Sequence, residues 1–192
     1  MAEGTGTALL VMDVQRVVVE RYVKEPKLLE RIATAIRSAR ASGVQVFYVF
    51  VGFRPGYPEI GQRSRWFGTI AKSGDFITGD MGTEIHPEVA PESGDILVKK
   101  LRVGAFAGSD LEVLLRSRGI GSLALTGIAT GGVVLSTVRH AADLDFRLSV
   151  LSDACADMDP EVHKVLLEKV FPRQANVLTV DQWVAELATS NA

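Results

Sequence analysis

Two ionisable side chains follow apolar segments that are expected to form strands. Open α/β sheets bind their ligands at the carboxyl ends of such strands. Asp13 comes directly after the apolar run of residues 8–12, and Lys100 follows the short apolar run of residues 96–98. A carboxyl group that faces an apolar crevice has a raised pKa, which suits it to general acid or base catalysis. Taken alone, each residue has a second explanation. Asp13 also fits a turn or a helix cap, and Lys100 also fits a solvated surface position.

A glycine-rich turn is the third candidate. It spans residues 127–133, between the apolar run 123–126 and a predicted helix that extends to about residue 144. Where a strand runs into a helix, backbone N–H groups without intrahelical partners and the helix dipole favour negative charge. Two adjacent glycines also occur in ordinary strand–helix connections, so the turn alone does not define a site.

Cationic and aromatic residues gather in the segment 53–67. They are Arg54, Tyr57, Arg63, Arg65, Trp66 and Phe67. Guanidinium groups among aromatic rings can hold a carboxylate through paired hydrogen bonds. Arginine and aromatic residues are also enriched at subunit interfaces. The segment therefore fits a substrate clamp, an oligomer contact or both.

The elements that must position these residues alternate along the chain. Apolar patterns predict strands at residues 7–14, 45–51, 96–99, 123–126, 147–151 and 176–179. Predicted helices cover residues 26–42, 110–118, the segment up to about 144, a stretch that begins at 159–161, and 181–187. Such alternation is typical of a parallel sheet covered by helices. We expect an α/β fold, a three-layer α/β/α sandwich with a six-stranded parallel sheet. Residues 1–192 should form one domain with a core of about 7–183, and residues 52–94 an irregular loop or lid.

Composition excludes several classes of protein. The net charge of −2 gives no basic surface for nucleic acid, and no apolar run approaches the roughly 20 residues of a membrane span. Residues 1–6 lack the pattern of a signal peptide, and the one cysteine, Cys155, fits a reducing compartment. We therefore expect a cytoplasmic protein that acts on a small molecule. His86, His140 and His163 have no metal-ligand spacing and are expected at the surface, so we expect no metal and no cofactor.

Four motifs together resemble the isochorismatase-like hydrolases. They are Asp-x-Gln at residues 13–15, Lys-x-Arg-x-x-Ala-Phe-x-Gly-Ser-Asp-Leu at 100–111, Gly-Ile-Ala-Thr at 127–130 and Asp-Ala-Cys-Ala-Asp at 153–157. The resemblance runs from about Thr7 to Trp183. It implies a catalytic aspartate at Asp13 and a catalytic lysine at Lys100, which has the right spacing to Arg102, rather than at Lys99.

The resemblance also implies the geometry of the turn and the assembly. The family has a non-proline cis peptide bond here, expected between Ile128 and Ala129, in a turn that includes Thr130. That bond would direct the N–H groups of Ala129 and Val133 toward one point, an oxyanion hole. Family members usually form dimers or tetramers, so a homodimer or homotetramer is expected. The candidates for substrate binding are Gln15, Arg54, Trp66 and Phe106.

One position departs from the family pattern. The signature Gly-Val-Ala-Thr-Asp-x-Cys-Val-x-Ser-Thr has its nucleophilic cysteine where this chain has Val133. Valine has no nucleophilic atom, which excludes covalent catalysis at this position. Cys155 follows a different strand and is not expected to substitute. Ser136 and Thr137 are expected to bond back to their helix, and no histidine is obviously placed to activate Thr130.

Catalysis without a thiol has a precedent in the resembled family. Isochorismatases carry glycine at the cysteine position and hydrolyse a vinyl ether, which needs a general acid and a water molecule. We therefore expect Asp13 and Lys100 to hydrolyse a small, possibly carboxylated molecule by acid–base catalysis. One alternative is a binding protein or pseudoenzyme on the same fold, and another is an amidase that uses Thr130 or a water molecule.

Overall fold

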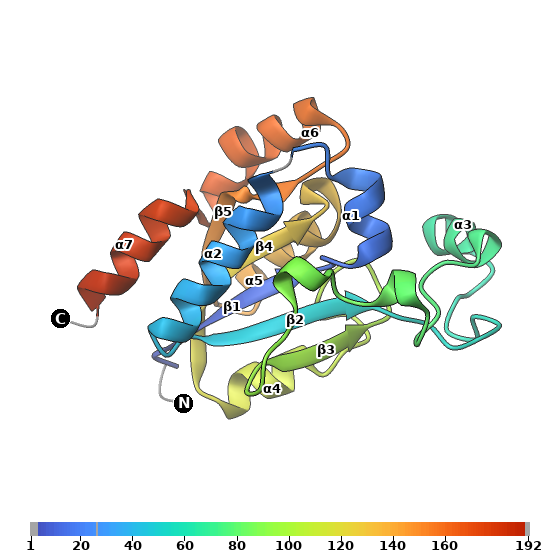
Figure 1. Ribbon diagram of the computed structural model, residues 1–192, viewed down its shortest axis with the longest axis horizontal. Helices are drawn as coiled ribbons and strands as arrows, with labels where there is room; N and C mark the ends of the chain where they lie inside the picture. The colour runs from blue at the N-terminus through green and yellow to red at the C-terminus, as the bar shows by residue number, and fades with distance from the viewer. Residues whose placement is uncertain (1–3, 26, 191–192) are drawn as a thin grey trace.

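The computed structural model describes residues 4–25 and 27–190. Its centre is one six-stranded parallel sheet with the strand order β3-β2-β1-β4-β5-β6 (Figure 1). The strands are β1 (Gly6–Met12), β2 (Gln45–Val51), β3 (Ile96–Lys100), β4 (Ile120–Ile128), β5 (Arg147–Ala156) and β6 (Asn176–Leu178). The predicted sheet is confirmed. Strands β4 and β5 are longer than predicted, and β1 ends before Asp13.

Helices cover both faces of the sheet and complete the three layers. They are α1 (Arg16–Tyr22), α2 (Lys27–Ala41), α3 (Arg65–Ser73), α4 (Leu111–Ser117), α5 (Leu135–Asp143), α6 (Pro160–Val165) and α7 (Val180–Ser190). Short helical turns are η1 (Met81–Thr83), η2 (Pro87–Val89), η3 (Thr130–Val134), η4 (Leu166–Val170) and η5 (Phe171–Arg173). Pro26, the first residue of one predicted helix, lies outside the described residues. No described helix is long and apolar enough to cross a membrane.

Strand β1 supplies both cores because successive side chains of a strand point to opposite faces. Leu10 packs in the cluster that includes residues of α4 and α5, whereas Leu9 packs in the cluster built with α1, α2 and α7. In Figure 1, α1 and α2 lie in front of the sheet and α5 lies behind it. Burial on both faces accounts for the continuous apolar run of β1.

Between β1 and β4, backbones approach so closely that one position requires glycine. Gly127 pairs with Met12 across the two strands. It has φ +147°, and a Cβ atom there would lie 2.3 Å from the carbonyl oxygen of Met12. The chain reverses its direction of winding at this pair of strands, since β2 and β3 lie on one side of β1 and β4 to β6 on the other. Open α/β sheets bind ligands at such a switch point.

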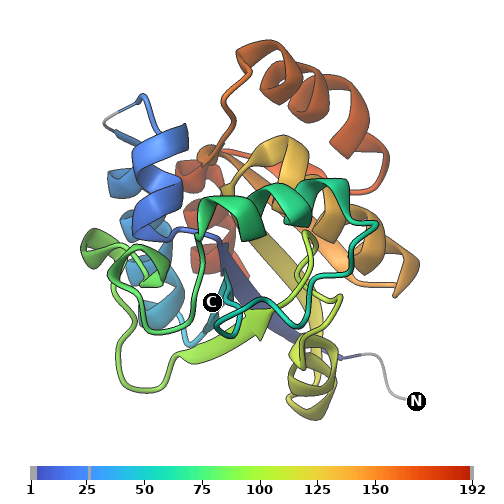
Figure 2. The same ribbon diagram turned by 90° about the vertical axis from the view of Figure 1, so that its right-hand side faces the viewer.

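Two helices differ from the sequence-based prediction. Helix α1 was not predicted, because its valine-rich sequence has modest helix propensity; burial of Val18 and Val19 stabilises it. The segment 52–94 was predicted to be irregular, but it contains α3, which ends at Gly74 with φ +79°. Helix α3 buries little apart from Phe67. Figure 2, a view from the carboxyl ends of the strands, shows α3 crossing in front of the sheet.

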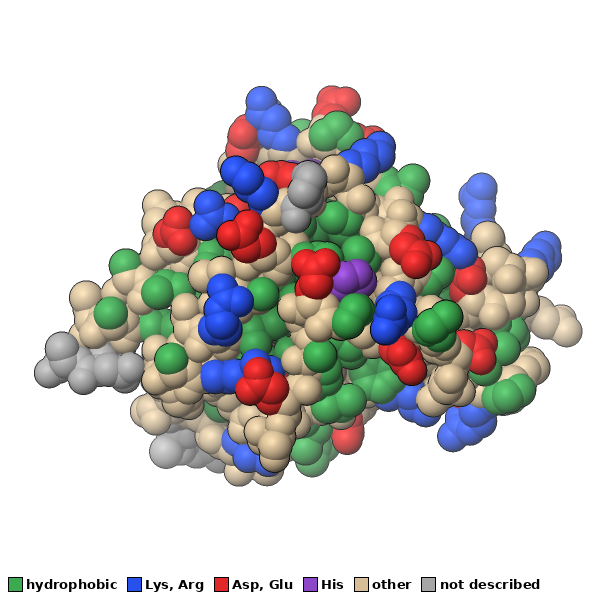
Figure 3. All heavy atoms as spheres, in the orientation of Figure 1, with side chains coloured by type: hydrophobic (Ala, Val, Ile, Leu, Met, Phe, Trp, Pro, Cys, Tyr) green, Lys and Arg blue, Asp and Glu red, His purple; other side chains and the backbone are tan. Residues whose placement is uncertain are grey.

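Charges of both signs are interspersed on the face of the molecule drawn in Figure 3. Acidic and basic side chains alternate there, and they do not form a large area of one sign. This distribution agrees with the small net charge of −2.

Candidate active site

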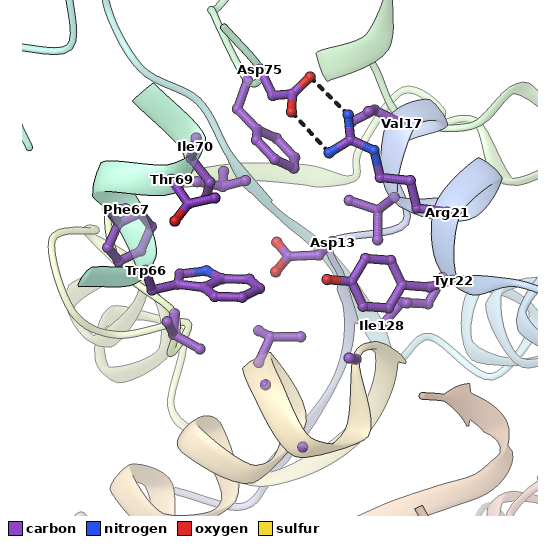
Figure 4. A pocket seen from close by; sticks show the side chains of 18 of the residues that line it. Asp13, Val17, Arg21, Tyr22, Trp66, Phe67, Thr69, Ile70, Asp75 and Ile128 are labelled. Atoms are coloured by element: carbon purple, nitrogen blue, oxygen red, sulfur yellow. Dashed lines mark hydrogen bonds and ion pairs between the residues drawn. The ribbon is translucent and has the colours of Figure 1, made fainter. Parts of the chain in front are cut away.

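A cavity of about 580 Å³ lies at the carboxyl ends of the strands (Figure 4). Its floor comes from the residues at or just after the ends of five neighbouring strands: Asp13, Val51, Lys100, Ile128 and Asp157. The volume is in the range that binds small molecules. The topology therefore collects side chains from distant parts of the chain into one site.

The walls of the cavity are largely apolar. Helix α3 contributes Trp66, Phe67 and Ile70, and α1 contributes Val17 and Val18. Figure 4 shows the indole ring of Trp66 and the phenol ring of Tyr22 on opposite sides of the space below Asp13. Trp66 was predicted to contact substrate, and the structure places it in the cavity lining.

Asp13 and Lys100 form an ion pair inside the cavity. Lys100 Nζ lies 2.9 Å from Asp13 Oδ2, and the two side chains are only 2% and 12% exposed. The neighbouring Lys99 points to the exposed side of β3. The predicted contact, and the choice of Lys100 over Lys99, are confirmed; the catalytic roles of the pair remain a prediction.

Lys100 is fully occupied by protein groups. Its Nζ also donates to the carbonyl oxygens of Arg102 and Val103, at 3.0 Å each. An ammonium group has three donors. Lys100 therefore orients Asp13 and has no N–H left for a water molecule or a ligand.

Asp13 is held in a backbone conformation that few residues adopt. Its φ is +55°, in the left-handed region, and its N–H donates to Val49 O at 2.8 Å. The second carboxyl oxygen, Oδ1, is buried and has no hydrogen-bond partner within the described part of the chain. Burial raises the pKa of Asp13 above its usual value although Lys100 opposes the shift. Burial thus makes this carboxyl group easier to protonate than an exposed aspartate.

The glycine-rich turn forms another part of the cavity lining. The peptide bond Ile128–Ala129 is cis, as predicted. It leads into the π-helical turn η3, where Val133 is buried and lines the cavity. Val133 thus presents an isopropyl group close to Asp13 and Lys100, where the resembled family has a thiol. The direction of the Ala129 and Val133 amides stays a prediction.

Thr130 faces away from the cavity, toward helix α6. It is fully buried, outside the cavity lining, and its Oγ1 lies 2.8 Å from Nδ1 of His163. His163, expected at the surface, is half-buried, and it reaches Thr130, for which the sequence showed no obvious histidine partner. The contact forms because α6 packs over the turn, which brings together residues 33 positions apart. Burial lowers the pKa of His163.

Asp157 fixes the backbone of the same turn. Its Oδ2 accepts a hydrogen bond from Gly131 N at 2.6 Å, and its Oδ1 accepts one from Asp159 N at 3.2 Å. The motif at residues 153–157 was a signal for Asp157, but its partner could not be read from the sequence.

Three of the residues proposed for substrate binding lie outside the cavity lining. Gln15 is fully buried and bonds to the backbone, donating to Val51 O and Thr83 O and accepting from Val51 N. Arg54 pairs with Glu59. Phe106 packs in the core against His140 and Phe146. Each side chain has structural partners instead of a position beside a ligand.

The remaining hydroxyl and thiol groups of interest have structural positions too. Thr137 Oγ1 accepts from Ala105 N at 3.1 Å, so the expectation that it bonds back to its own helix is not met. Cys155 lies in the core, outside the cavity lining, and burial raises its pKa to about 12. No group of three or more His, Cys, Asp or Glu side chains in the described ranges is arranged to hold a metal ion.

An ion pair at the cavity was not anticipated. Arg21 on α1 bonds bidentately to Asp75, which follows α3, at 2.8 and 3.0 Å (Figure 4). Both residues line the cavity. The sequence could not reveal the pair, because α1 was not predicted and the partners are 54 positions apart.

Comparison with known proteins agrees with this geometry. The profile of the Isochorismatase domain matches residues 7–182. The ureidoacrylate amidohydrolase RutB of Stutzerimonas stutzeri is 33% identical, over 94% of this chain and 79% of its own length. The uncharacterized isochorismatase family protein YecD of Escherichia coli O157:H7 is 32% identical, over 92% of this chain and 93% of its own length.

Solved structures show the same fold. A cysteine hydrolase from Pseudomonas syringae pv. phaseolicola superposes with a TM-score of 0.88 at 24% identity, over 96% of this chain and 93% of its own. The N-carbamoylsarcosine amidase of Thermoplasma acidophilum superposes with a TM-score of 0.75 at 28% identity, over 92% of this chain and 98% of its own.

Proposed function

This chain belongs to the isochorismatase domain family of hydrolases, and on that premise we propose that it hydrolyses a small molecule through Asp13, without a cysteine nucleophile. The observation that carries the proposal is the buried Asp13–Lys100 pair in the cavity lining, in which Asp13 Oδ1 has no protein partner. A buried ion pair is costly to maintain, and the fold does not require a charge at this place.

Covalent catalysis has no candidate nucleophile of the family's kind in this cavity. Val133 has no nucleophilic atom, and Cys155 is buried in the core with a pKa of about 12. The hydroxyl groups of Thr69 and Ser73 line the cavity but donate to backbone carbonyl groups of α3. A mechanism that uses only proton transfer and water fits these residues best.

Hydrolysis of a vinyl ether illustrates such a mechanism. Protonated Asp13 delivers its proton to the alkene carbon, which leaves an oxocarbenium ion. Water adds to that ion and returns a proton to the Asp13 carboxylate; collapse of the resulting hemiketal breaks the C–O bond and releases an alcohol and a carbonyl compound. The raised pKa of Asp13 supports the first step.

Lys100 acts as a positioning residue in this proposal. Its three donors hold Asp13 Oδ2 and two carbonyl groups, so it fixes the orientation of the Asp13 carboxyl group. The predicted oxyanion hole at Ala129 and Val133 would stabilise negative charge on a reacting oxygen.

One argument for a carboxylated substrate, a clamp formed by arginine, does not hold for Arg54. Arg54, the proposed clamp residue, bonds to Glu59 outside the cavity. The substrate proposed from the cavity volume of about 580 Å³ is therefore simply a small molecule. A homodimer or homotetramer remains a prediction.

An amidase is the second candidate function. It is favoured by the names of two similar proteins, a ureidoacrylate amidohydrolase and an N-carbamoylsarcosine amidase. Thr130 has a histidine partner but lies outside the cavity lining, so an amidase would use water activated by Asp13. If Thr130 were the nucleophile, Thr130→Val would abolish turnover. A water mechanism predicts that turnover survives the change.

A substrate panel tests the proposed function. Wild type and Asp13→Asn are incubated with vinyl ethers and small amides, and products are followed by proton NMR. Asp13→Asn is nearly isosteric and should cut turnover by about 10² or more. If wild type turns over no compound, and both proteins bind a ligand equally well, the chain is a binding protein or pseudoenzyme instead.

A further inference from the structure

We propose that the cavity selects an uncharged molecule, and that the Arg21–Asp75 pair is the device that excludes carboxylates. This inference rests on the proposed function, because it names the substrate class of the same site. It also replaces the sequence-based expectation of a possibly carboxylated substrate.

Every cationic group in the cavity lining already has a protein partner. Within the described part of the chain, the lining contains two cations, Arg21 and Lys100. Lys100 donates to Asp13 and two carbonyl groups. Arg21 presents both of its terminal nitrogens to the two oxygens of Asp75. A bidentate contact of this kind is the one that a carboxylate ligand would itself make with arginine, so Asp75 occupies the place of an anionic ligand.

Carboxyl groups outnumber the cations. Asp13, Asp75 and Asp157 line the same cavity. Asp157 accepts from two backbone amides, and Asp75 accepts from Arg21, which lowers the pKa of Asp75. An anionic ligand would leave water, meet the carboxylate of Asp75 and find no unpaired cation. Burial of a charge without a partner is strongly unfavourable.

The polar groups that remain suit an uncharged ligand. The carboxyl group of Asp13 and the hydroxyl of Tyr22 are both directed into the space beside Trp66 (Figure 4). Burial raises the pKa of Tyr22, so the phenol stays protonated and can donate a hydrogen bond. Trp66 is 58% exposed despite its large ring. A neutral molecule with an apolar body and one or two polar atoms would cover this ring and use both groups.

Matched amides and carboxylates test the inference by binding alone. The probes are benzamide with benzoate, and phenylacetamide with phenylacetate, at pH 7. Binding is followed by the fluorescence of Trp66; Trp66→Phe identifies the signal, since the other tryptophan, Trp183, is only 4% exposed. Wild type should bind each amide about tenfold or more tightly than its carboxylate partner. Equal or tighter binding of the carboxylates overturns the inference, and so does failure to bind either amide.

The variants assign the selectivity to the ion pair. Asp75→Asn releases Arg21 and should reduce the amide-to-carboxylate preference by about tenfold, whereas a further Arg21→Gln change should restore it. Asp181→Asn alters the net charge equally, but Asp181 pairs with Arg31 outside the cavity lining, so the preference should not change. Thermal unfolding confirms that each variant is folded. An unchanged preference in Asp75→Asn overturns the role of the pair.

Turnover is not needed for any of these measurements. If wild type prefers the amides but hydrolyses nothing in the substrate panel, the proposed function fails and the selectivity stands. If it hydrolyses substrates but binds carboxylates as tightly as amides, the proposed function stands and this inference fails.

Discussion

Lys100 Nζ lies 2.9 Å from Oδ2 of Asp13, whereas Oδ1 of the same carboxyl group has no hydrogen-bond partner within the described residues. The two oxygens of Asp13 therefore have different environments. One is held by a cation, and the other is buried without a protein partner. A carboxyl group held in this way is oriented as general acid–base catalysis requires.

Replacement of Lys100 should move the titration of Asp13. Burial raises the pKa of Asp13 and Lys100 lowers it, so Lys100→Gln should raise this pKa further. Because protonated Asp13 is the proposed acid, activity should be present below its pKa and fall as pH rises through it. The falling limb of the pH–rate profile should therefore shift to higher pH.

The carboxyl ¹³C chemical shift of Asp13 measures the same change without a substrate. Its midpoint should lie above 3.8 in wild type and higher still in Lys100→Gln. A midpoint that stays in place or falls in the variant would show that Lys100 does not control this carboxyl group.

Thiol reagents should distinguish the buried Cys155 from a cysteine introduced in the cavity lining at residue 133. Native wild type should form no adduct with iodoacetamide near neutral pH, because Cys155 is buried and its pKa is about 12. Val133→Cys should place a thiol in the cavity lining and form one adduct by mass spectrometry. Cys155→Ala should leave turnover within about twofold, since it does not alter the acid–base pair. Labelling of native wild type would contradict the assignment of Cys155 to the core.

Two adjacent glycines of the turn should respond differently to alanine. At Gly131, a Cβ atom would lie 3.0 Å from Val162 Cγ1 and 3.1 Å from Asp157 Oδ2. The two oxygens of Asp157 each accept a hydrogen bond from a backbone amide, which fixes the carboxylate. At Gly132, the nearest atom would be Ala129 Cβ at an ordinary 3.7 Å. We expect Gly131→Ala to lower the free energy of unfolding by about 1–2 kcal/mol through overpacking.

Gly132→Ala is the matched control for that change. It should cost nothing, or add about 0.5–1 kcal/mol through helix propensity. Urea denaturation measures both free energies of unfolding. Equal effects of the two substitutions would mean that α6 can shift to accommodate the Cβ atom added at residue 131.

Gln15 should prove to be a structural residue. Gln15→Leu has a similar volume but leaves the N–H and C=O groups of Val51 and the carbonyl of Thr83 without their buried partner. Unsatisfied groups of this kind cost about 1–3 kcal/mol each, so the free energy of unfolding should fall by about 3 kcal/mol or more. Gln45→Leu, which removes an exposed bond to Gly94 O, should cost less than about 1 kcal/mol. If Gln15→Leu weakened ligand binding and left stability unchanged, the residue would belong to the site after all.

Local patterns were sufficient for the sheet and for the acid–base pair. Strands β1, β2 and β4 are largely buried on both faces, and continuous apolar runs reveal such strands directly. Asp13 and Lys100 stand out because they end two of these runs. Parallel strands present their carboxyl ends at one edge, so the meeting of the two residues follows from their positions in the sequence.

Neither α1 nor α3 had such a clear pattern. The valine-rich residues 16–22 favour a strand by propensity, and packing of Val18 and Val19 makes them a helix. Most of α3 is exposed, so it has only a narrow buried stripe around Phe67. Whether such segments form helices depends on the surfaces against which they pack.

The sequence by itself determined the order of the strands along the chain, the polar residues that end them and the replacement of a nucleophile by Val133. Tertiary structure alone decided how those and other side chains are partnered. In the folded chain Arg21 bonds to Asp75, Thr130 to His163 and Gln15 to the backbone, across separations of 33 to 68 positions. The physical reason is the range of the interactions. Hydrophobic periodicity is a local property of a segment, whereas a hydrogen bond depends on distances of a few tenths of an ångström that only the packed chain determines.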